Sequence, residues 1–359
     1  MARSQPARHY SRLITKQFAF LASLLSLAAL LTHPLAAAPN TNTRFYTETS
    51  HKLGGAFLRF FDMHGGIPVF GYPISDELME GGLPVQYFER QRFEYHREAA
   101  GTPYEVQLGH LGKELSPEGA PFGPVPPIKE TPDQIYIEET QHTLSNAFLR
   151  YWRAHGGVQL LGYPITEPAV ENGYMVQYFE RARMEYHPEK AASGYEVELG
   201  HLGTEYVRVH PEVSSTIAQG LKVVPHTLTS SEQELMGHIN RARQAAGLQP
   251  VGIDARLSTL ALSRSYDMAT RGYFAHTTPE GSDFTFLLSG VNFPYKVAGE
   301  ILAHNNYGPD EAVQIAYNDF MKSASHKQVI LDPLYTIVGA GEAIDGKGFH
   351  YFTVIFVYK

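Results

Sequence analysis

Three short stretches in the last third of the chain each place one metal-ligand or acid–base group beside small or turn-forming residues. They contain His276, Glu300 and His326. Two imidazoles and one carboxylate are a common ligand set for a divalent metal, zinc above all. Because 24 and 26 residues separate the three, no single helix or turn can unite them, and a folded domain must do so. A hydrogen-bonded structural cluster is the alternative interpretation of the same residues.

Two helices are predicted ahead of His276. The sequence Ser231–Glu234 is typical of a capping box, and apolar residues follow it at helical spacing. A second amphipathic helix is predicted from Leu257 through Met268, with an end near Gly272. His276 then lies just beyond the end of that helix.

A third helix and two strands are predicted behind His276. Pro309, followed by two acids, is typical of the start of a helix, which runs to Ser323 and leaves His326 just beyond its end. Residues 337–344 and 349–358 alternate as paired strands. The region is therefore predicted to pack helices on a short antiparallel sheet.

The run 234–359 resembles the bacterial branch of the CAP superfamily (cysteine-rich secretory, antigen 5 and pathogenesis-related proteins, also called SCP-like). The resemblance rests on several motifs in order: Asn240-Arg241-Ala242-Arg243, Gly247-Leu248, the helix 257–268, the His276-x-x-Pro-x-Gly loop, Gly299-Glu300, Ser323-Ala324-Ser325-His326-Lys327, Gly339-Ala340-Gly341 and the strand 351–358. It implies an α-β-α sandwich whose cavity is lined by His276, Glu300 and His326 and binds a divalent cation in many members.

Four positions depart from the family pattern. Ile301 replaces the usual Asn, residues 324–325 replace Pro-Gly, and Phe320 stands where tryptophan is common. The second glutamate of the eukaryotic cavity has no evident counterpart in the helix ahead of His326. His350, in the run His-Tyr-Phe-Thr, resembles the eukaryotic His-Tyr-Thr-Gln strand and is an alternative metal ligand to His326.

Residues 1–38 have the layout of a secretory signal peptide. Four basic residues precede an apolar run, and the small-x-small site 36–38 follows it. The apolar run is short for a membrane span, so no integral span is expected after cleavage. We therefore expect a secreted or cell-envelope-associated protein.

The net charge and the absence of cysteine argue against some classes of partner and exclude some covalent modifications. The formal charge is −8 and becomes −12 when the four basic residues of the signal are removed (−8 − 4), which argues against nucleic acid or an anionic membrane as the main partner. No cysteine is present, so disulfides and a lipid-modified N-terminal cysteine are excluded.

An internal duplication fills the middle of the chain. Four motifs recur 91 residues apart without an insertion: Phe57-Leu58-Arg59, Gly71-Tyr72-Pro73-Ile74, Val85 to Arg90, and Leu108 to Gly112 return from Phe148, Gly162, Val176 and Leu199. Each copy combines a helix with a small antiparallel sheet of extended runs. The duplication predicts two small α+β modules, which we expect to fold independently.

The predicted order is a signal peptide (1–38), module 1 (45–115), a proline-rich linker (116–133), module 2 (134–208), a second linker (209–229) and the CAP-type domain (230–359). The Gly-Tyr-Pro motifs resemble LGFP-type repeats of bacterial envelope proteins, which implies a role at a cell envelope. The recurrent Tyr, Phe, Glu, Arg and His could form a sugar-binding face, although core aromatics and ion pairs explain them as well.

Two functions remain open at this level. The first is a non-enzymatic, envelope-associated binding module whose cavity holds a divalent metal and whose partner is envelope polysaccharide or peptide. The second is a metal-assisted hydrolase of peptide or cell-wall material, with Glu300 as the candidate general base. The chain lacks His-Glu-x-x-His, Gly-x-Ser-x-Gly and cysteine, which favours binding over catalysis.

Overall fold

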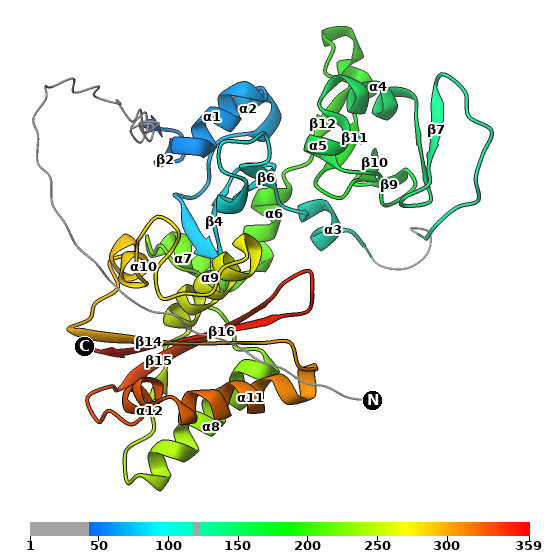
Figure 1. The fold of residues 1–359 in the computed structure, drawn as a ribbon. Coiled ribbons are helices and arrows are strands. Elements are labelled where there is room, and N and C mark those ends of the chain that lie inside the picture. The colour runs from blue at the N-terminus through cyan, green and yellow to red at the C-terminus, as the bar shows by residue number, and fades with distance from the viewer. Residues whose placement is uncertain (1–42, 118–122) are drawn as a thin grey trace, which may run out of the picture. The chain divides into compact units, whose positions relative to one another are not determined.

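The computed structural model describes residues 43–117 and 123–359 (Figure 1). The predicted signal peptide lies outside these residues. In the described part of the chain, no helix has both the length and the apolar character needed to cross a bilayer. Helices and strands alternate throughout, so the predicted α+β class is confirmed.

A four-stranded sheet forms the centre of the C-terminal domain. Its order is β13-β15-β16-β14, with β16 antiparallel to both of its neighbours and β13 parallel to β15. The strands are β13 (Gly252–Ile253), β14 (Val297–Asn305), β15 (Ile337–Ile344) and β16 (His350–Tyr358). The paired strands predicted at 337–344 and 349–358 are confirmed, and β14 is an edge strand of this sheet.

Helices cover both faces of this sheet, as the side chains of β16 show. Val354 and Phe356 pack into the core formed with the first helical layer, whereas Ile355 and Val357 pack into the core on the opposite face. The first layer contains α8 (Ser230–Ala245), α11 (Pro309–Lys322) and α12 (Ala324–Ile330), and the second contains α9 (Ala255–Arg271) and α10 (Thr285–Gly290) (Figure 1). The predicted α-β-α sandwich is therefore present.

Helix α9 lies unusually close to the sheet. A Cβ atom added to Gly341 on β15 would lie 2.1 Å from the backbone nitrogen of Leu262 on α9, so only glycine fits there. Helix α9 ends at Gly272 with a left-handed φ of 67°, as predicted from the sequence. The close approach places the backbone of α9 directly against β15.

The two modules have the same element order. Module 1 contains β1 (Thr43–Tyr46), β2 (His51–Gly54), α1 (Gly55–Met63), α2 (Gly66–Phe70), β3 (Leu78–Glu80), β4 (Leu83–Tyr87), β5 (Arg92–Tyr95), η1 (Arg97–Ala99), β6 (Val106–Leu108) and α3 (Leu111–Leu115). Module 2 contains β7 (Gln134–Ile137), β8 (His142–Ser145), α4 (Asn146–Ala154), α5 (Gly157–Leu161), β9 (Ala169–Glu171), β10 (Tyr174–Tyr178), β11 (Arg183–Tyr186), η2 (Pro188–Ser193), β12 (Val197–Leu199) and α6 (Leu202–Val209), after which α7 (Pro211–Ala218) leads to the C-terminal domain.

The modules exchange their last helices. The backbone nitrogen of Lys113 on α3 donates to the carbonyl of Glu180 in module 2, and that of Thr204 on α6 donates to the carbonyl of Glu89 in module 1, both at 3.1 Å. One hydrophobic cluster also contains core residues of both modules, Phe93 and Met184 among them. The expectation that each repeat folds independently therefore disagrees with the structure, because each module lacks part of its own packing.

The start of α8 corrects one detail of the sequence prediction. The capping box is formed by Thr229 and Glu232, two residues earlier than the predicted Ser231–Glu234. The backbone nitrogen of Thr229 donates to the Glu232 carboxylate at 2.7 Å. Both sequences satisfy the capping-box pattern, so the pattern alone could not choose the register.

Candidate functional site

Glu300 lies at the centre of the polar cluster predicted from the sequence. It belongs to the edge strand β14, and its side chain is 1 % exposed. Oε1 accepts a 3.0 Å hydrogen bond from Nε of Arg264, and Oε2 lies 2.9 Å from Nδ1 of His276. A carboxylate buried to this degree needs such partners, since an unpaired charge in the interior is strongly unfavourable. Glu300 thus connects α9 to the loop that carries His276.

Arg264 holds that loop in place. Its side chain is 2 % exposed, and two further nitrogens donate to the Tyr273 hydroxyl and the Ala275 carbonyl, each at 2.7 Å. Burial opposes the charge of Arg264, but the neighbouring Glu300 carboxylate and the Tyr273 hydroxyl outweigh it and raise the pKa. The guanidinium therefore stays charged and fixes the backbone immediately before His276.

His276 is the exposed member of the cluster. Its side chain is 57 % exposed, and its Nδ1 atom faces the Glu300 carboxylate. Because a carboxylate can only accept, Nδ1 carries the proton in the neutral ring, and Nε2 keeps its lone pair. A carboxylate behind an imidazole in this way orients the ring of many metal-ligating histidines.

His326 reaches the same place from the other helical layer. It lies in the first turn of α12, where the Ser323 hydroxyl accepts from its backbone nitrogen at 3.4 Å. Its ring packs edge-on against Phe320 at 5.5 Å and against His276 at 6.2 Å between centroids. Burial, and next the charge of His276, lower the pKa of His326. The neutral imidazole, which is the ligand form, is therefore favoured.

The position of β14 at the sheet edge explains how these residues meet. His276 follows the helix on one face of the sheet, and His326 belongs to a helix on the other face. Around an edge strand, the two helical layers can come into contact without a strand between them. The structure therefore brings together the three residues that the sequence analysis selected.

His350, the alternative ligand, lies elsewhere. It pairs with Asn305 in the sheet, whereas Glu300 pairs with Ile355, so the two sites are about 16 Å apart along the strands. The His350 side chain is 6 % exposed, and its Nδ1 atom contacts Glu342 at 2.6 Å. His350 does not belong to the cluster of His276, because it is the first residue of β16, five residues before the partner of Glu300.

The atoms that are available in His276, His326 and Glu300 decide how a metal ion would fit. Within residues 43–117 and 123–359, no group of three or more His, Cys, Asp or Glu side chains has the arrangement of a metal site. Both oxygens of Glu300 already have partners, one of them the buried Arg264. The residues fit a site in which His276 and His326 supply nitrogen ligands, while Glu300 supports His276 from behind.

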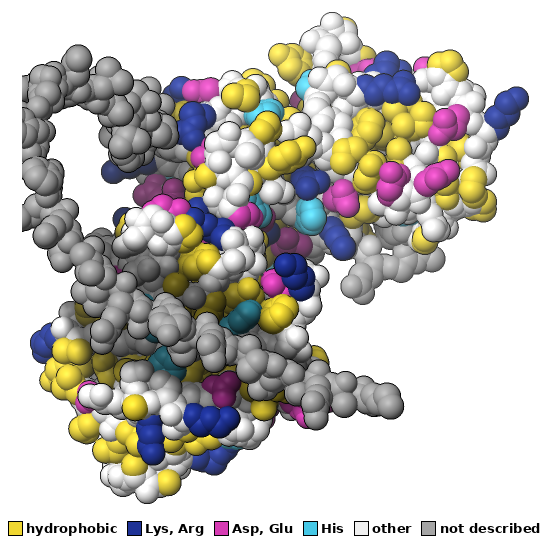
Figure 2. All heavy atoms as spheres, viewed as in Figure 1, with side chains coloured by type: hydrophobic (Ala, Val, Ile, Leu, Met, Phe, Trp, Pro, Cys, Tyr) yellow, Lys and Arg dark blue, Asp and Glu magenta, His cyan; other side chains and the backbone are white. Residues whose placement is uncertain are grey.

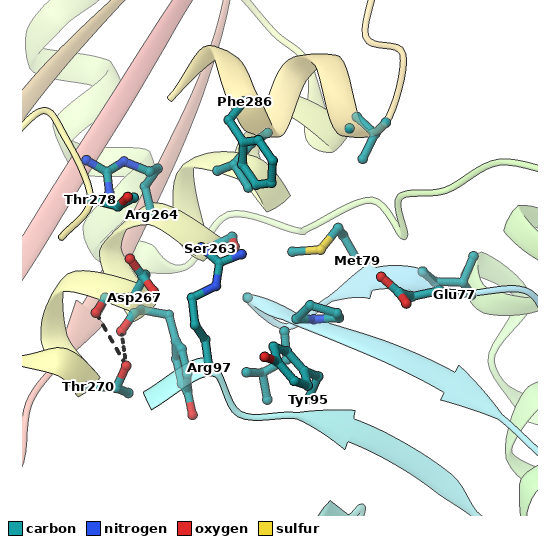
Figure 3. A pocket seen from close by; sticks show the side chains of 18 of the residues that line it. Glu77, Met79, Tyr95, Arg97, Ser263, Arg264, Asp267, Thr270, Thr278 and Phe286 are labelled. Atoms are coloured by element: carbon teal, nitrogen blue, oxygen red, sulfur yellow. Dashed lines mark hydrogen bonds between the residues drawn. The ribbon is translucent and has the colours of Figure 1, made fainter. Parts of the chain in front are cut away.

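A separate cavity of about 410 Å³ lies between α9 and module 1 (Figure 3). Phe286 of α10 covers one side, and the guanidinium of Arg97 lies 5.9 Å from its ring centroid. Arg264 and Thr278 also line this cavity, so it shares its wall with the loop of His276. The sequence analysis did not predict it, because it forms between regions far apart in the chain.

Sequence reasoning also missed Arg264, although a signal existed. Leu257, Ala261, Arg264 and Met268 follow one helical stripe, and the three apolar members are completely buried. A charged residue on such a stripe requires a buried partner of opposite charge. That requirement predicts a carboxylate beside Arg264, and Glu300 fulfils it.

The C-terminal sequence matches a known family. The profile of the cysteine-rich secretory protein family, CAP, covers residues 236–357. Residues 236–357 are a CAP domain. Within the CAP domain lie His276, Glu300 and His326, whereas modules 1 and 2 lie outside the match.

Two curated relatives from Bacillus subtilis (strain 168) match over a similar length. The uncharacterized protein YkwD is 35 % identical over 124 residues, which is 34 % of this chain and 46 % of the relative. The uncharacterized membrane protein YlbC is 27 % identical over 129 residues, 36 % of this chain and 35 % of the relative. The chain thus spans less than half the length of these relatives.

One of the solved structures that the comparison matches is an extracellular protein containing an SCP domain from Bacillus anthracis. It is 14 % identical, and the alignment covers 81 % of this chain and 86 % of that chain with a TM-score of 0.31.

Proposed function

We propose that the CAP domain is a binding module that holds a divalent cation, zinc foremost, between His276 and His326. The observation that carries this proposal is the 2.9 Å contact of the His276 Nδ1 atom with Glu300, beside the ring of His326. That contact leaves the His276 Nε2 lone pair available, and two neutral imidazoles suit zinc. Water or a ligand would complete the coordination.

The electrostatics of His276 and His326 also support metal binding. The lowered pKa of His326 keeps its imidazole neutral to a lower pH than usual. Its cause includes repulsion from His276, and the same repulsion would oppose two imidazolium ions at this distance. A bound cation would replace those protons, so the pair of imidazoles favours metal over a doubly protonated state.

The binding role is favoured over metal-assisted hydrolysis. A bound zinc ion could polarise a substrate or activate water. A general base must reach the proton it removes, but the Glu300 carboxylate is buried and ion-paired with Arg264. In this arrangement Glu300 serves to position His276 rather than to accept a proton from water.

The setting that we propose is the cell envelope. The predicted signal peptide would direct the chain out of the cytoplasm, and the Gly-Tyr-Pro motifs of the two modules resemble the LGFP-type repeats of envelope proteins. Envelope polysaccharide or peptide is then the partner class. The relative YlbC, which is described as a membrane protein, is consistent with this setting.

Metal content and hydrolysis, measured on the same sample, test the proposal. Equilibrium dialysis of the full chain against zinc is expected to load one ion, and peptide and cell-wall substrates are expected to remain intact with or without chelator. Hydrolysis that a chelator abolishes would overturn the binding role in favour of the enzymatic one. Absence of zinc binding would overturn the metal assignment itself.

A further inference from the structure

The duplication provides an internal comparison between two equivalent hairpins. The hairpin β3–β4 of module 1 corresponds to β9–β10 of module 2, 91 residues later. Both turn through two residues with positive φ, at Gly81 and Gly82 in one copy and at Asn172 and Gly173 in the other. The backbone is therefore the same in both copies, and any difference lies in what covers it.

In module 1 the outer edge of β3 is paired with a later segment of the chain. The backbone nitrogen of Met79 donates to the Lys222 carbonyl, and the nitrogen of Val224 donates to the Met79 carbonyl, each at 2.9 Å. The bridge between Met79 and Val223 is parallel. Val223 and Val224 are 4 % and 5 % exposed, so this short segment, 222–224, covers the edge of the sheet with buried aliphatic side chains through one parallel bridge.

The turn of the same hairpin is covered as well. A Cβ atom added to Gly82 would lie 3.2 Å from Cβ of Tyr266 on α9. The corresponding Gly173 in module 2 has no atom within 4 Å of such a Cβ position. The hairpin of module 1 therefore packs on the CAP domain, whereas that of module 2 meets no described residue at its turn.

The equivalent edge in module 2 is apolar and exposed. Val170, Tyr174 and Met175 are 69 %, 37 % and 40 % exposed, and they correspond to Met79, Leu83 and Pro84. Strand β9 is at the edge of its sheet, and Val170 forms no isolated bridge within the described residues. Hydrophobic side chains appear on the visible surface of module 2 in Figure 2. Val170 and Met175 pair directly and share one face of the sheet, whereas the Tyr174 ring lies against His187 on the other, so we call Val170 and Met175 together the β9 face.

The backbone of Val170 is ready for pairing. Val170 lies opposite Met175 in the same register as Met79 opposite Pro84. Proline has no N–H, so the latter pair is not hydrogen-bonded, and the N–H and C=O of Met79 point outward to segment 222–224. The matching register gives the N–H and C=O of Val170 the same outward direction.

The course of the chain explains why, in the part that the structure describes, the edge of β3 is covered and the edge of β9 is not. Helix α6, which docks on module 1, runs to Val209 and continues into α7 and the segment that pairs with Met79. Its counterpart α3, which docks on module 2, ends at Leu115, shortly before Pro117. Among the described residues, the chain after α3 forms no bridge to β9.

We propose that the β9 face binds an extended aliphatic segment of a partner protein by parallel strand addition, as β3 binds segment 222–224 within the chain. Exposed edges pair readily with added strands, and the main-chain hydrogen bonds supply affinity while apolar side chains supply selectivity. The partner segment carries consecutive β-branched residues, because that is the chemistry that covers the equivalent edge.

A labelled peptide with the sequence of residues 219–226 is the probe, and the full chain is the target. In the full chain, segment 222–224 already occupies the edge of β3. We therefore expect the peptide to bind at one saturable site, the edge of β9, and fluorescence anisotropy detects this binding. Val170→Pro removes the N–H donor from an edge position where proline is tolerated, and should weaken binding about tenfold. Tyr195→Ala, which removes an exposed aromatic from another part of module 2, should leave binding unchanged.

Three results would overturn the proposal. They are the absence of saturable binding to the wild type, equal binding by V170P, and concentration-dependent self-association that V170P abolishes, because the occupant would then be a second copy. If V170P loses the native circular dichroism spectrum, Met175→Lys gives the same test with the backbone unchanged. A peptide in which both valines are replaced by aspartate is the matched negative probe.

Discussion

Arg264 donates a 3.0 Å hydrogen bond to Glu300, and the side chains of the two residues are only 2 % and 1 % exposed. This buried ion pair joins α9 to the edge strand β14. It also leaves one Glu300 oxygen for His276. Arg264 therefore holds Glu300 in place, and Glu300 in turn positions the exposed imidazole of His276.

The first prediction concerns the loss of Arg264. Arg264→Met leaves the Glu300 carboxylate buried without a cation, so the free energy of unfolding should fall by about 3–5 kcal/mol in urea titrations. The same change at an exposed pair provides the control. Lys322→Met removes the partner of Asp319, where both side chains are more than half exposed, and should cost at most about 1 kcal/mol.

Equal losses of unfolding free energy in R264M and K322M would contradict the claim that R264M leaves the Glu300 carboxylate buried without a cation. The double variant R264M with Glu300→Leu sharpens the test, because it removes both charges. It should recover part of the stability lost by R264M alone. No recovery would show that Arg264 acts mainly through Tyr273 and the Ala275 carbonyl instead.

The second prediction concerns pH. Burial and the charge of His276 lower the pKa of His326 in the folded state below the value of about 6.5 expected in the unfolded chain. The unfolded chain therefore binds the proton first as the pH falls, and the stability contributed by neutral His326 is complete above about pH 6.5 and declines below it.

His326→Gln removes this titration. The free energy of unfolding of wild type should fall more steeply between pH 6.5 and the lowered pKa than that of the variant, in metal-free buffer with chelator. His304, whose pKa burial lowers, remains in both proteins, so some slope persists in the variant. Identical slopes would show that His326 does not titrate differently in the folded state.

The third prediction tests the shared packing of the modules. A Cβ atom on Gly112 of α3 would lie 1.8 Å from the carbonyl oxygen of Phe179 in the other module. Replacing glycine by alanine inside a helix usually raises the free energy of unfolding by up to about 1 kcal/mol. Here the clash with the Phe179 carbonyl oxygen should lower it instead. Gly112→Ala should lower the midpoint of thermal unfolding, and Gly123→Ala, with open space around it, should not.

A truncation provides the complementary observation. A fragment of residues 43–117 should show no cooperative melt, whereas a fragment of residues 43–209, which contains both modules and both exchanged helices, should show one. A cooperative melt of the single module would contradict the reciprocal exchange as a requirement for folding. It would restore the expectation of two independent units.

The sequence predicted the local elements of the CAP domain more completely than their connections. Helix α11 begins at the predicted Pro309, and α9 ends at the predicted Gly272, because caps and prolines are local signals. Strand β14, which carries Glu300, was not predicted as a strand. Its hydrogen bonds run to β16, about 50 residues away, and nothing local requires them.

The modules show the same limit. The conserved spacing of the two copies indicated one structure repeated, and the shared element order agrees with it. Spacing cannot show which copy a helix packs against, so the exchange of α3 and α6 could not be predicted. The two turns are alike in sequence. The sequence therefore cannot show that Gly82 packs against Tyr266, whereas Gly173 meets no described residue.

The central claim is that His276 and His326 together hold a metal ion, and isothermal titration of the metal-free full chain with zinc tests it most directly. Wild type should bind one zinc ion, and His276→Ala and His326→Ala should each abolish stoichiometric binding. Glu300→Gln should weaken binding without abolishing it, because Glu300 orients His276 and does not ligate the ion. His350→Ala, which changes a histidine about 16 Å away along the strands, should bind as wild type does. Unchanged zinc binding in both H276A and H326A, or its loss only in H350A, would contradict the account.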